Sequence, residues 1–197
     1  MTPALAHALY ALAWLAFGLG HSLLAGRVWL GRWSRLAYNG IAVASFAGVS
    51  AVGAVTLAGQ PMFDLPAPVL AGLAAIHFGG WAVLLLSARH YDLGRLGGLT
   101  QLRHPDRPSD EELRLDGPHR WVRHPLYAGA FLILWGAAVN PLGLATACWG
   151  SLYLLAGTWC EERRLIRLYG RAYSDYRARV PAFAPWRGRV TDPGRRD

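Results

Sequence analysis

The chain has 197 residues, of which 53% are hydrophobic and 16% are charged, with a formal net charge of +8. Intrinsically disordered chains combine low hydrophobicity with high charge, so this composition excludes that class. All 20 basic residues are arginines, and residues 1–26, 36–88 and 125–162 contain none of them. A nucleic-acid-binding protein distributes its basic residues over a soluble surface, so this segregation argues against nucleic acid as a partner.

Long uncharged stretches occupy 114 of the 197 residues. They are residues 1–26, 36–63, 65–88 and 125–160. A helix needs about 20 mostly apolar residues to cross the hydrocarbon layer of a membrane, and each stretch is long enough. The pattern therefore predicts an integral membrane protein.

The predicted fold is all-α, with five transmembrane helices in a single domain that covers residues 1–197. The last uncharged stretch is too long for one span and contains Asn140-Pro141, a pair that favours a turn, so we expect a helical hairpin there. The predicted spans are 3–25, 36–58, 67–88, 122–139 and 141–160. The cytosolic segments, 89–121 and 161–197, are too short to form independent domains.

The first predicted span is expected to be retained, because a signal peptide begins with basic residues and no charge precedes Arg27. Arginines lie between the first two spans, between the third and fourth, and after the fifth. Since positively charged loops stay in the cytoplasm, we expect the N-terminus outside and the C-terminus in the cytosol. The expected location is a bacterial cytoplasmic (inner) membrane.

Beyond the last predicted span, apolar residues recur at three- and four-residue spacing among arginines. They are Leu165, Leu168, Tyr169, Ala172, Tyr173, Tyr176 and Val180. This spacing predicts an amphipathic C-terminal helix at the cytosolic interface. Binding to anionic lipid would explain its arginines, and a role as a lid over a polar site is compatible with that.

Polar and ionisable residues are expected to meet at one depth, where the spans reach the cytosol. Such groups are costly at membrane depth unless they face a partner or a wet cavity, and they are therefore candidate site residues. Each also has a structural interpretation: Arg123 can reach lipid headgroups, and the Glu161-Glu162 pair can bind neighbouring arginines. His21 and His77, on apolar helices, fit hydrogen-bonded core histidines. Convergence of acidic, basic and imidazole groups favours a functional site.

Five stretches carry a family resemblance. Residues 117–129 (GPHRWVRHPLYAG), a helical hairpin and residues 161–165 (EERRL) resemble a membrane methyltransferase superfamily that includes isoprenylcysteine carboxyl methyltransferases and phospholipid N-methyltransferases. Residues 21–25 (HSLLA), 91–93 (YDL) and 97–101 (GGLTQ) are similar to the branch that contains methanethiol S-methyltransferases and NnrU-type proteins. The stronger, C-terminal similarity covers about 65 residues.

The resemblance implies that S-adenosylmethionine binds at the cytosolic ends of the last two helices, beneath the C-terminal segment. The implied cofactor-binding residues are His119, Arg123, His124, Tyr127, Glu161 and Glu162. Their chemistry suits the cofactor, because Arg or His pairs with a carboxylate, Glu accepts from amines and hydroxyls, and Tyr packs on an adenine. Many relatives carry tyrosine where this chain has His119, which departs from the family pattern. No metal-site spacing occurs.

The expected reaction is methyl transfer to a small, methanethiol-like thiol at the cytosolic face. Gly157 stands where the prenylcysteine branch carries an arginine suited to a substrate carboxylate, which favours a neutral acceptor. A thiol attacks as its thiolate, so we expect a base, with His21 and Asp92 as the catalytic candidates.

Three other functions stay open. The acceptor can be a lipid or a prenylcysteine that enters from the bilayer. The chain can be a non-catalytic, NnrU-like accessory protein, or it can use a nicotinamide, because one fold hosts several cofactors. The expected partners are a small-molecule or lipid-soluble substrate and membrane lipids, without nucleic acid.

Overall fold

The computed structural model describes residues 1–25, 27, 29–104 and 113–187. All regular elements in these ranges are helical, which confirms the predicted all-α class. The helices are α1 (Pro3–Leu24), α2 (Ser34–Leu57), α3 (Ala67–Ala88), α4 (Leu93–Gly97), α5 (Leu99–Arg103), α6 (Pro125–Gly136), α7 (Pro141–Tyr169) and α8 (Arg171–Arg179), with short 3-10 turns η1 (Gly31–Trp33) and η2 (Gly117–Arg120).

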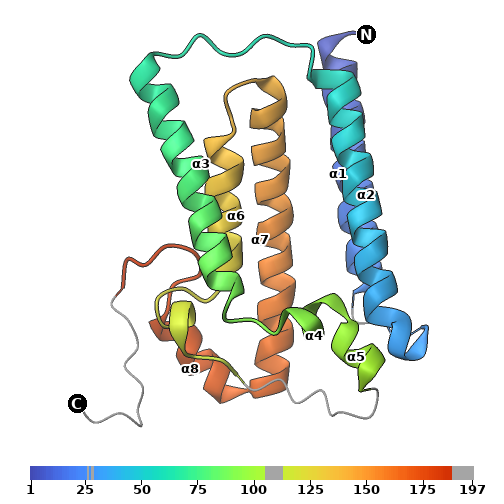
Figure 1. Cartoon of the computed structure of the whole chain (residues 1–197), viewed down its shortest axis with the longest axis vertical. Coiled ribbons are helices and arrows are strands. Elements are labelled where there is room, and N and C mark those ends of the chain that lie inside the picture. Colours follow the sequence, from blue (N-terminus) through green and yellow to red (C-terminus); the bar gives the residue numbers. More distant parts are fainter. Residues whose placement is uncertain (26, 28, 105–112, 188–197) are drawn as a thin grey trace.

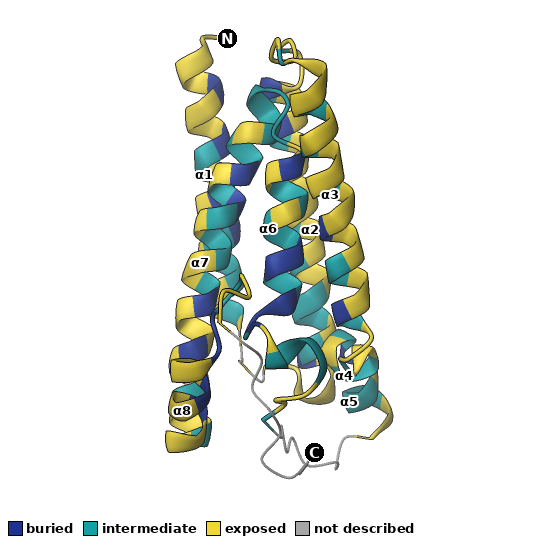
Figure 2. Ribbon diagram, turned by 90° about the vertical axis from the view of Figure 1, so that its left-hand side faces the viewer, coloured by how far each residue is buried: buried dark blue, intermediate teal, exposed yellow. Residues whose placement is uncertain are grey.

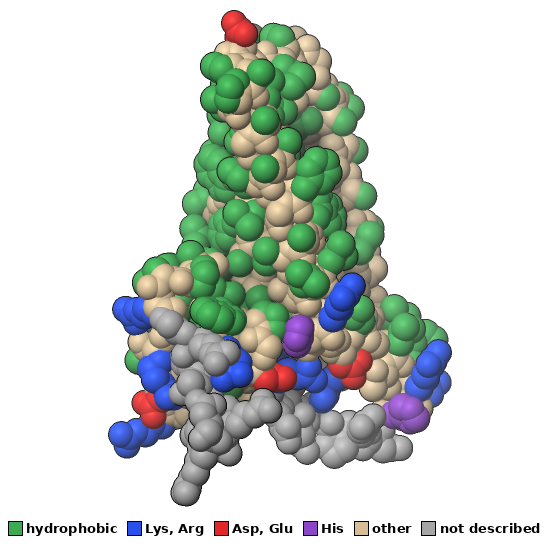
Figure 3. Space-filling model, turned by 60° about the vertical axis from the view of Figure 1, so that its left-hand side comes forward, with side chains coloured by type: hydrophobic (Ala, Val, Ile, Leu, Met, Phe, Trp, Pro, Cys, Tyr) green, Lys and Arg blue, Asp and Glu red, His purple; other side chains and the backbone are tan. Residues whose placement is uncertain are grey.

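Three helices are long and apolar enough to cross a membrane: α1, α2 together with η1, and α3. The bounds of α1, α2 and α3 themselves lie within two residues of the predicted spans. Large apolar side chains point outward along them, and Figure 2 shows buried residues confined to the faces that meet other helices. Figure 3 shows an apolar surface along the bundle, with arginines gathered toward one end and an acidic side chain at the opposite end. Five spans and the orientation stay predictions.

The expected hairpin is present, but its helices differ in length from the predicted spans. The turn lies where it was predicted: the Asn140 side chain accepts a hydrogen bond from the Gly143 N–H at 2.7 Å, and Pro141 occupies the first helical position. Helix α6 begins only at Pro125, because the residue before a proline disfavours helical geometry, and it has 12 residues. At 1.5 Å per residue its length is about 18 Å, short of a hydrocarbon layer of about 30 Å.

Helix α7 continues well beyond the predicted end of its span at residue 160 and stops at Tyr169. Glutamate, arginine and leucine are good helix formers, so the helix persists after the apolar run ends. Gly170, with φ of 57°, separates α7 from α8. The predicted amphipathic C-terminal helix is therefore divided into the end of α7 and the short α8.

Figure 1 shows α1 and α2 side by side, α3 beside α6, and α7 between the two pairs. The core between α1, α2 and α7 is aromatic, with Tyr10, Trp14 and Phe17 of α1 packed against Trp149 and Tyr153 of α7. The Tyr10 hydroxyl also forms a hydrogen bond of 2.8 Å with the Thr146 hydroxyl of α7.

Helices α3 and α6 approach each other so closely that glycines line their contact. A Cβ atom on Gly80 would lie 2.6 Å from the Ile133 nitrogen, and one on Gly129 would lie 2.8 Å from the Leu84 nitrogen. Nearby, His77 Nδ1 forms a hydrogen bond of 2.9 Å with the Ile133 carbonyl, and its Nε2 accepts from Trp81 at 3.1 Å. Both ring nitrogens are thus engaged, which agrees with a structural role for His77.

Candidate functional site

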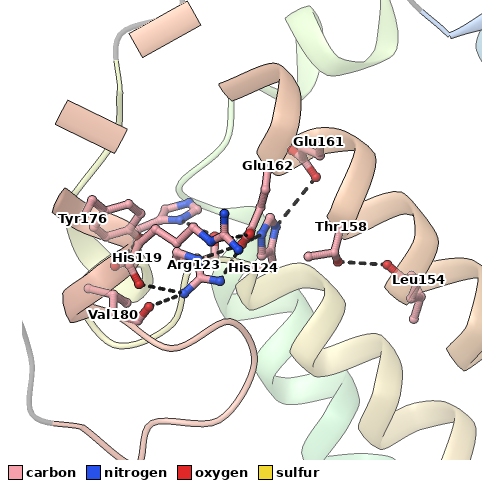
Figure 4. A network of polar contacts seen from close by, with 10 residues as sticks. His119, Arg123, His124, Leu154, Thr158, Glu161, Glu162, Tyr176 and Val180 are labelled. Carbon is pink, nitrogen blue, oxygen red and sulfur yellow. Dashed lines mark hydrogen bonds and ion pairs between the residues drawn. The ribbon is translucent and has the colours of Figure 1, made fainter. Parts of the chain in front are cut away.

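A buried carboxylate, Glu162 of α7, is the centre of an ionic cluster at the end of the bundle (Figure 4). Its Oε1 accepts from Arg123 Nε at 2.8 Å and lies 3.1 Å from His124 Nε2, while Oε2 lies 3.1 Å from Arg177 Nε. Burial would raise the pKa of Glu162, but the hydrogen bonds from His124 and Arg123 outweigh it and lower the pKa to about 2. Glu162 is therefore a carboxylate whose charge is already matched within the protein.

Arg123 joins the start of α6 to the segment that follows α8. Its Nη1 donates to the Val180 carbonyl and, at 3.3 Å, to the Arg177 carbonyl. Backbone hydrogen bonds join the same two segments. The Arg123 N–H donates to the Pro181 carbonyl at 2.9 Å, and the His124 N–H donates to the Ala182 carbonyl at 3.0 Å. The C-terminal segment is thereby fixed over the beginning of α6.

Glu161, the neighbour of Glu162, has a different environment. Its side chain is 44% exposed, and its Oε2 lies 3.7 Å from His124 Nδ1, beyond hydrogen-bond length. His124 stacks on Tyr127, with ring centroids 5.5 Å apart and planes 9° from parallel. The flat imidazole and phenol pair lies beside an accessible carboxylate, which is a suitable arrangement for a ligand with a planar ring and hydrogen-bond donors.

His119, on η2, lies on the other side of Arg123. Its Nδ1 is 3.2 Å from the Arg123 carbonyl, and its own carbonyl accepts from the Tyr176 hydroxyl at 2.6 Å. Burial lowers the pKa of His119. The Tyr91 ring meets the His119 ring edge-on at 5.5 Å, and burial, followed by the charge of Glu161, raises the pKa of the Tyr91 hydroxyl. Both side chains are therefore neutral near neutral pH.

The structure thus brings together the six predicted cofactor-binding residues around Glu161 and Glu162 of α7. It also adds Arg177, which the sequence interpretation did not place in the site, and it brings Tyr91, of the motif at residues 91–93, against His119. The periodic spacing did place Tyr173 and Tyr176 on the apolar face of α8, where they pack with Val180. No comparable signal marked Arg177, because its ion pair with Glu162 depends on how α8 folds back against α7.

The two predicted catalytic residues lie in different local structures, and their described hydrogen bonds go to partners outside the ionic cluster. His21 of α1 forms a hydrogen bond with the Tyr38 hydroxyl of α2, and its ring meets Tyr153 of α7 edge-on at 5.7 Å. Asp92 caps the N-terminus of α4, where its Oδ1 accepts from the Arg95 N–H at 2.9 Å. Within the described residues, no hydrogen bond or ion pair joins either side chain to Glu161 or Glu162.

These contacts fit S-adenosylmethionine in part. Glu161, His124 and Tyr127 offer an accessible acceptor and a flat stacked pair, as an amine, a ribose and an adenine require. Arg123 and Glu162 instead bind each other and the C-terminal segment. Their arrangement suits residues that hold the site in shape.

Curated proteins named methanethiol S-methyltransferase are similar to this chain. The protein called methanethiol S-methyltransferase 1 of Bradyrhizobium diazoefficiens is 31% identical over 122 residues, which are 60% of this chain and 43% of that relative. The Crocosphaera subtropica protein is 29% identical over 114 residues, covering 56% of this chain and 45% of the relative. The Mycobacterium tuberculosis protein is 28% identical over 186 residues, covering 89% and 76%.

These relatives confirm the resemblance to the methanethiol S-methyltransferase branch of membrane methyltransferases. The matched region spans less than half the length of the first two relatives. No family model matches the chain. No solved structure matches it either.

Proposed function

We propose that the protein is an S-adenosylmethionine-dependent membrane methyltransferase that acts on a small thiol. The observation that carries the proposal is the meeting of His124 and Tyr127 with Glu161, contributed by two helices, at the end of an apolar bundle. The names of the similar proteins support the same reaction and a methanethiol-like acceptor.

In this proposal, the residues of the cluster have two kinds of role. Glu161, His124 and Tyr127 bind the cofactor, and His119 lines the site with Tyr91. Arg123 and Glu162 position these residues by holding the C-terminal segment against α6 and α7. When bound, the cofactor would supply a methyl group on a sulfonium. The protein would orient the acceptor thiol and shield it from water.

The proposed base is His21, with Asp92 as the less favoured candidate. Asp92 Oδ1 is engaged as a helix cap, whereas His21 lies against α7, the helix that carries the acidic pair. General-base catalysis contributes about 10²–10⁴-fold, and His21→Gln should lower turnover by that factor. Cofactor affinity should be unchanged in this variant, because His21 makes no described contact with the acidic pair.

The protein is proposed to act in the bacterial cytoplasmic membrane with its site toward the cytosol. The three membrane-length helices support membrane insertion, and the arginine distribution supports the orientation. Membrane lipids would be its lasting partners, with the thiol as a membrane-permeant substrate.

The test is calorimetric titration of the detergent-purified protein with S-adenosylmethionine and with reduced nicotinamide adenine dinucleotide. Release of S-adenosylhomocysteine is then assayed with methanethiol, prenylcysteines and phospholipids. We expect binding of the sulfonium compound and turnover with the thiol. Glu161→Gln should weaken binding, and Glu111, outside the described residues, should tolerate the matched Glu→Gln change.

Other outcomes would identify the alternatives. Lack of S-adenosylmethionine binding would refute the proposal, and binding of the nicotinamide in its place would indicate a reductase-like function. Binding without turnover on any acceptor would indicate the accessory protein. Turnover with phospholipids or prenylcysteines alone would keep the methyltransferase and change its acceptor.

A further inference from the structure

A small pocket of about 60 Å³ lies between α1 and α2, and its lining residues do not include those of the ionic cluster. Phe17 and Gly20 of α1 and Ala42 and Ser45 of α2 contribute to its walls, and His21 and Tyr38 also line it. The Ser45 hydroxyl donates to its own helix, to the Ile41 carbonyl at 2.6 Å. The His21 imidazole and the Tyr38 phenol are therefore the polar groups of the pocket that can bind a ligand.

His21 has one engaged and one unengaged ring nitrogen. Its Nε2 is hydrogen-bonded to the Tyr38 hydroxyl, while Nδ1 is buried and has no hydrogen-bond partner in the described part of the chain. The ring is held in place by its contacts with Phe17 at 5.6 Å and Tyr38 at 4.8 Å between centroids. A buried polar atom without a partner is uncommon and calls for an explanation, which a bound ligand would supply.

The volume of the pocket limits the size of such a ligand. An apolar cavity of about 150 Å³ accommodates benzene, which has six non-hydrogen atoms, or about 25 Å³ for each. A pocket of about 60 Å³ then has room for two or three non-hydrogen atoms. Methanethiol has two and ethanethiol has three, whereas prenyl or lipid chains are far larger.

We propose that this pocket binds the acceptor thiol, and that Tyr38 positions His21 to take its proton. The inference rests on the proposed methyltransferase function and specifies its acceptor site. In the proposed tautomer Nε2–H donates to the Tyr38 oxygen, which leaves the lone pair of the buried Nδ1 as the acceptor of the thiol proton. The S–H bond breaks with its electron pair left on sulfur, and the proton forms an N–H bond at Nδ1.

Filling the pocket provides the first test. A Cβ atom on Gly20 meets no atom within 4 Å, so Gly20→Leu can enter the pocket without displacing backbone. Gly40 of α2 also has nothing within 4 Å, does not line the pocket and is exposed, and Gly40→Leu is the matched control. Both changes favour the helix, since leucine has the higher helix propensity.

The main readout does not need the cofactor. Histidine side chains are labelled with ¹⁵N, the His21 signals are assigned by their loss in His21→Gln, and thiols are titrated into the cofactor-free protein in detergent. Methanethiol and ethanethiol should shift the His21 signals, and 1-butanethiol should bind at least tenfold more weakly. Gly20→Leu should weaken ethanethiol binding at least tenfold, and Gly40→Leu should bind it as the unaltered protein does.

Gly20→Ala and Tyr38→Phe make the test more specific. Gly20→Ala adds a single methyl group and should reduce binding of ethanethiol more than binding of methanethiol. Tyr38→Phe keeps the ring and removes the hydroxyl, so it should change the ¹⁵N shifts that report the protonated nitrogen of His21. It should also lower kcat with little effect on KM, whereas a merely structural tyrosine would leave the His21 tautomer unchanged.

Equal binding of butanethiol and ethanethiol, or normal ethanethiol binding by Gly20→Leu, would overturn the proposal. Unchanged His21 shifts in Tyr38→Phe would overturn the role of Tyr38. Failure of the proposed function has a different signature: thiols would bind at His21 as described, while S-adenosylmethionine would not bind to the protein.

Discussion

Arg123 and Glu162 are joined by two contacts, from Nε to Oε1 at 2.8 Å and from Nη2 to Oε1 at 2.6 Å. Their side chains are only 10% and 8% exposed, so the pair is largely removed from water. A buried pair is weak support for stability in itself, but removal of one partner leaves an uncompensated charge. This relationship makes the ionic cluster sensitive to single substitutions.

Substitution of the two adjacent glutamates should destabilise the protein to very different extents. Glu162→Gln leaves Arg123 buried without its anion, and we expect the free energy of unfolding to fall by about 3–5 kcal/mol. Glu161→Gln, at a side chain that is 44% exposed, should change it by less than about 1 kcal/mol. Detergent-based unfolding followed by tryptophan fluorescence checks both values. Equal destabilisation by the two variants would contradict this division of roles.

Stability should fall in acid through Glu162. Burial opposes ionisation, yet the hydrogen bonds from His124 and Arg123 lower the pKa of Glu162 from 4.5 to about 2. A carboxyl with a depressed pKa in the folded state stabilises that state above its unfolded pKa, and this contribution is lost as the pH falls from 4.5 toward about 2. The melting temperature, measured across that range, should decline, and Glu162→Gln should lack this component of the decline.

His119 should add a separate effect at higher pH. Burial lowers its pKa from 6.5, so the unfolded chain binds a proton more readily than the folded protein does. Its contribution is present above pH 6.5 and is lost progressively as the pH falls below that value. His119→Gln should flatten the pH dependence of the melting temperature just below 6.5, and an unaltered curve would contradict the prediction.

Adjacent glycines of α3 provide a matched test of its contact with α6. The Cβ atom of Gly80→Ala would press on the Ile133 nitrogen, and we expect a loss of about 1–3 kcal/mol from overpacking. Gly79 has nothing within 4 Å, so Gly79→Ala should be neutral or slightly stabilising. Unfolding midpoints in a denaturing-detergent titration compare the two, and similar midpoints would show that the helices can move apart freely.

Asp92 can be tested as a helix cap rather than a base. Asn caps a helix about as well as Asp, whereas Ala does not and costs about 0.5–2 kcal/mol. We therefore expect Asp92→Asn to keep normal turnover and Asp92→Ala to lose stability in α4, measured by hydrogen exchange of its amides. A large loss of turnover in Asp92→Asn would contradict this and indicate that Asp92 is the catalytic base.

Much of the helical framework was predictable from the sequence, because apolar length and charge mark where helices enter the hydrocarbon. The bounds of α3 agree with the prediction at both ends. The bounds of α6 and α7 do not agree with the prediction. Hydropathy marks where a helix leaves the apolar layer, whereas helical hydrogen bonding can begin or end at other residues. Gly170 separates α7 from α8. Glycine favours turns, but no pattern in the neighbouring sequence identifies this glycine as the break.

The candidate site was predictable as a group of residues and less so in its internal pairing. The motif positions Arg123, His124, Glu161 and Glu162 do meet. Which glutamate is buried depends on the rotation of α7 against α6, and the Arg177 contact depends on the return of α8. Neither is encoded in local spacing.

The uninterrupted course of α7 links the acidic pair to the thickness of the surrounding lipid. At 1.5 Å per residue, the length of helix from Pro141 to Glu161 is about 30 Å, equal to a typical hydrocarbon layer. If α7 crosses the membrane as the sequence predicts, an upright helix would hold Glu161 at the headgroup boundary when Asn140 lies at the opposite one. Longer acyl chains would draw the carboxylate into hydrocarbon unless the lipid thinned around it, so turnover in reconstituted vesicles should depend on acyl-chain length.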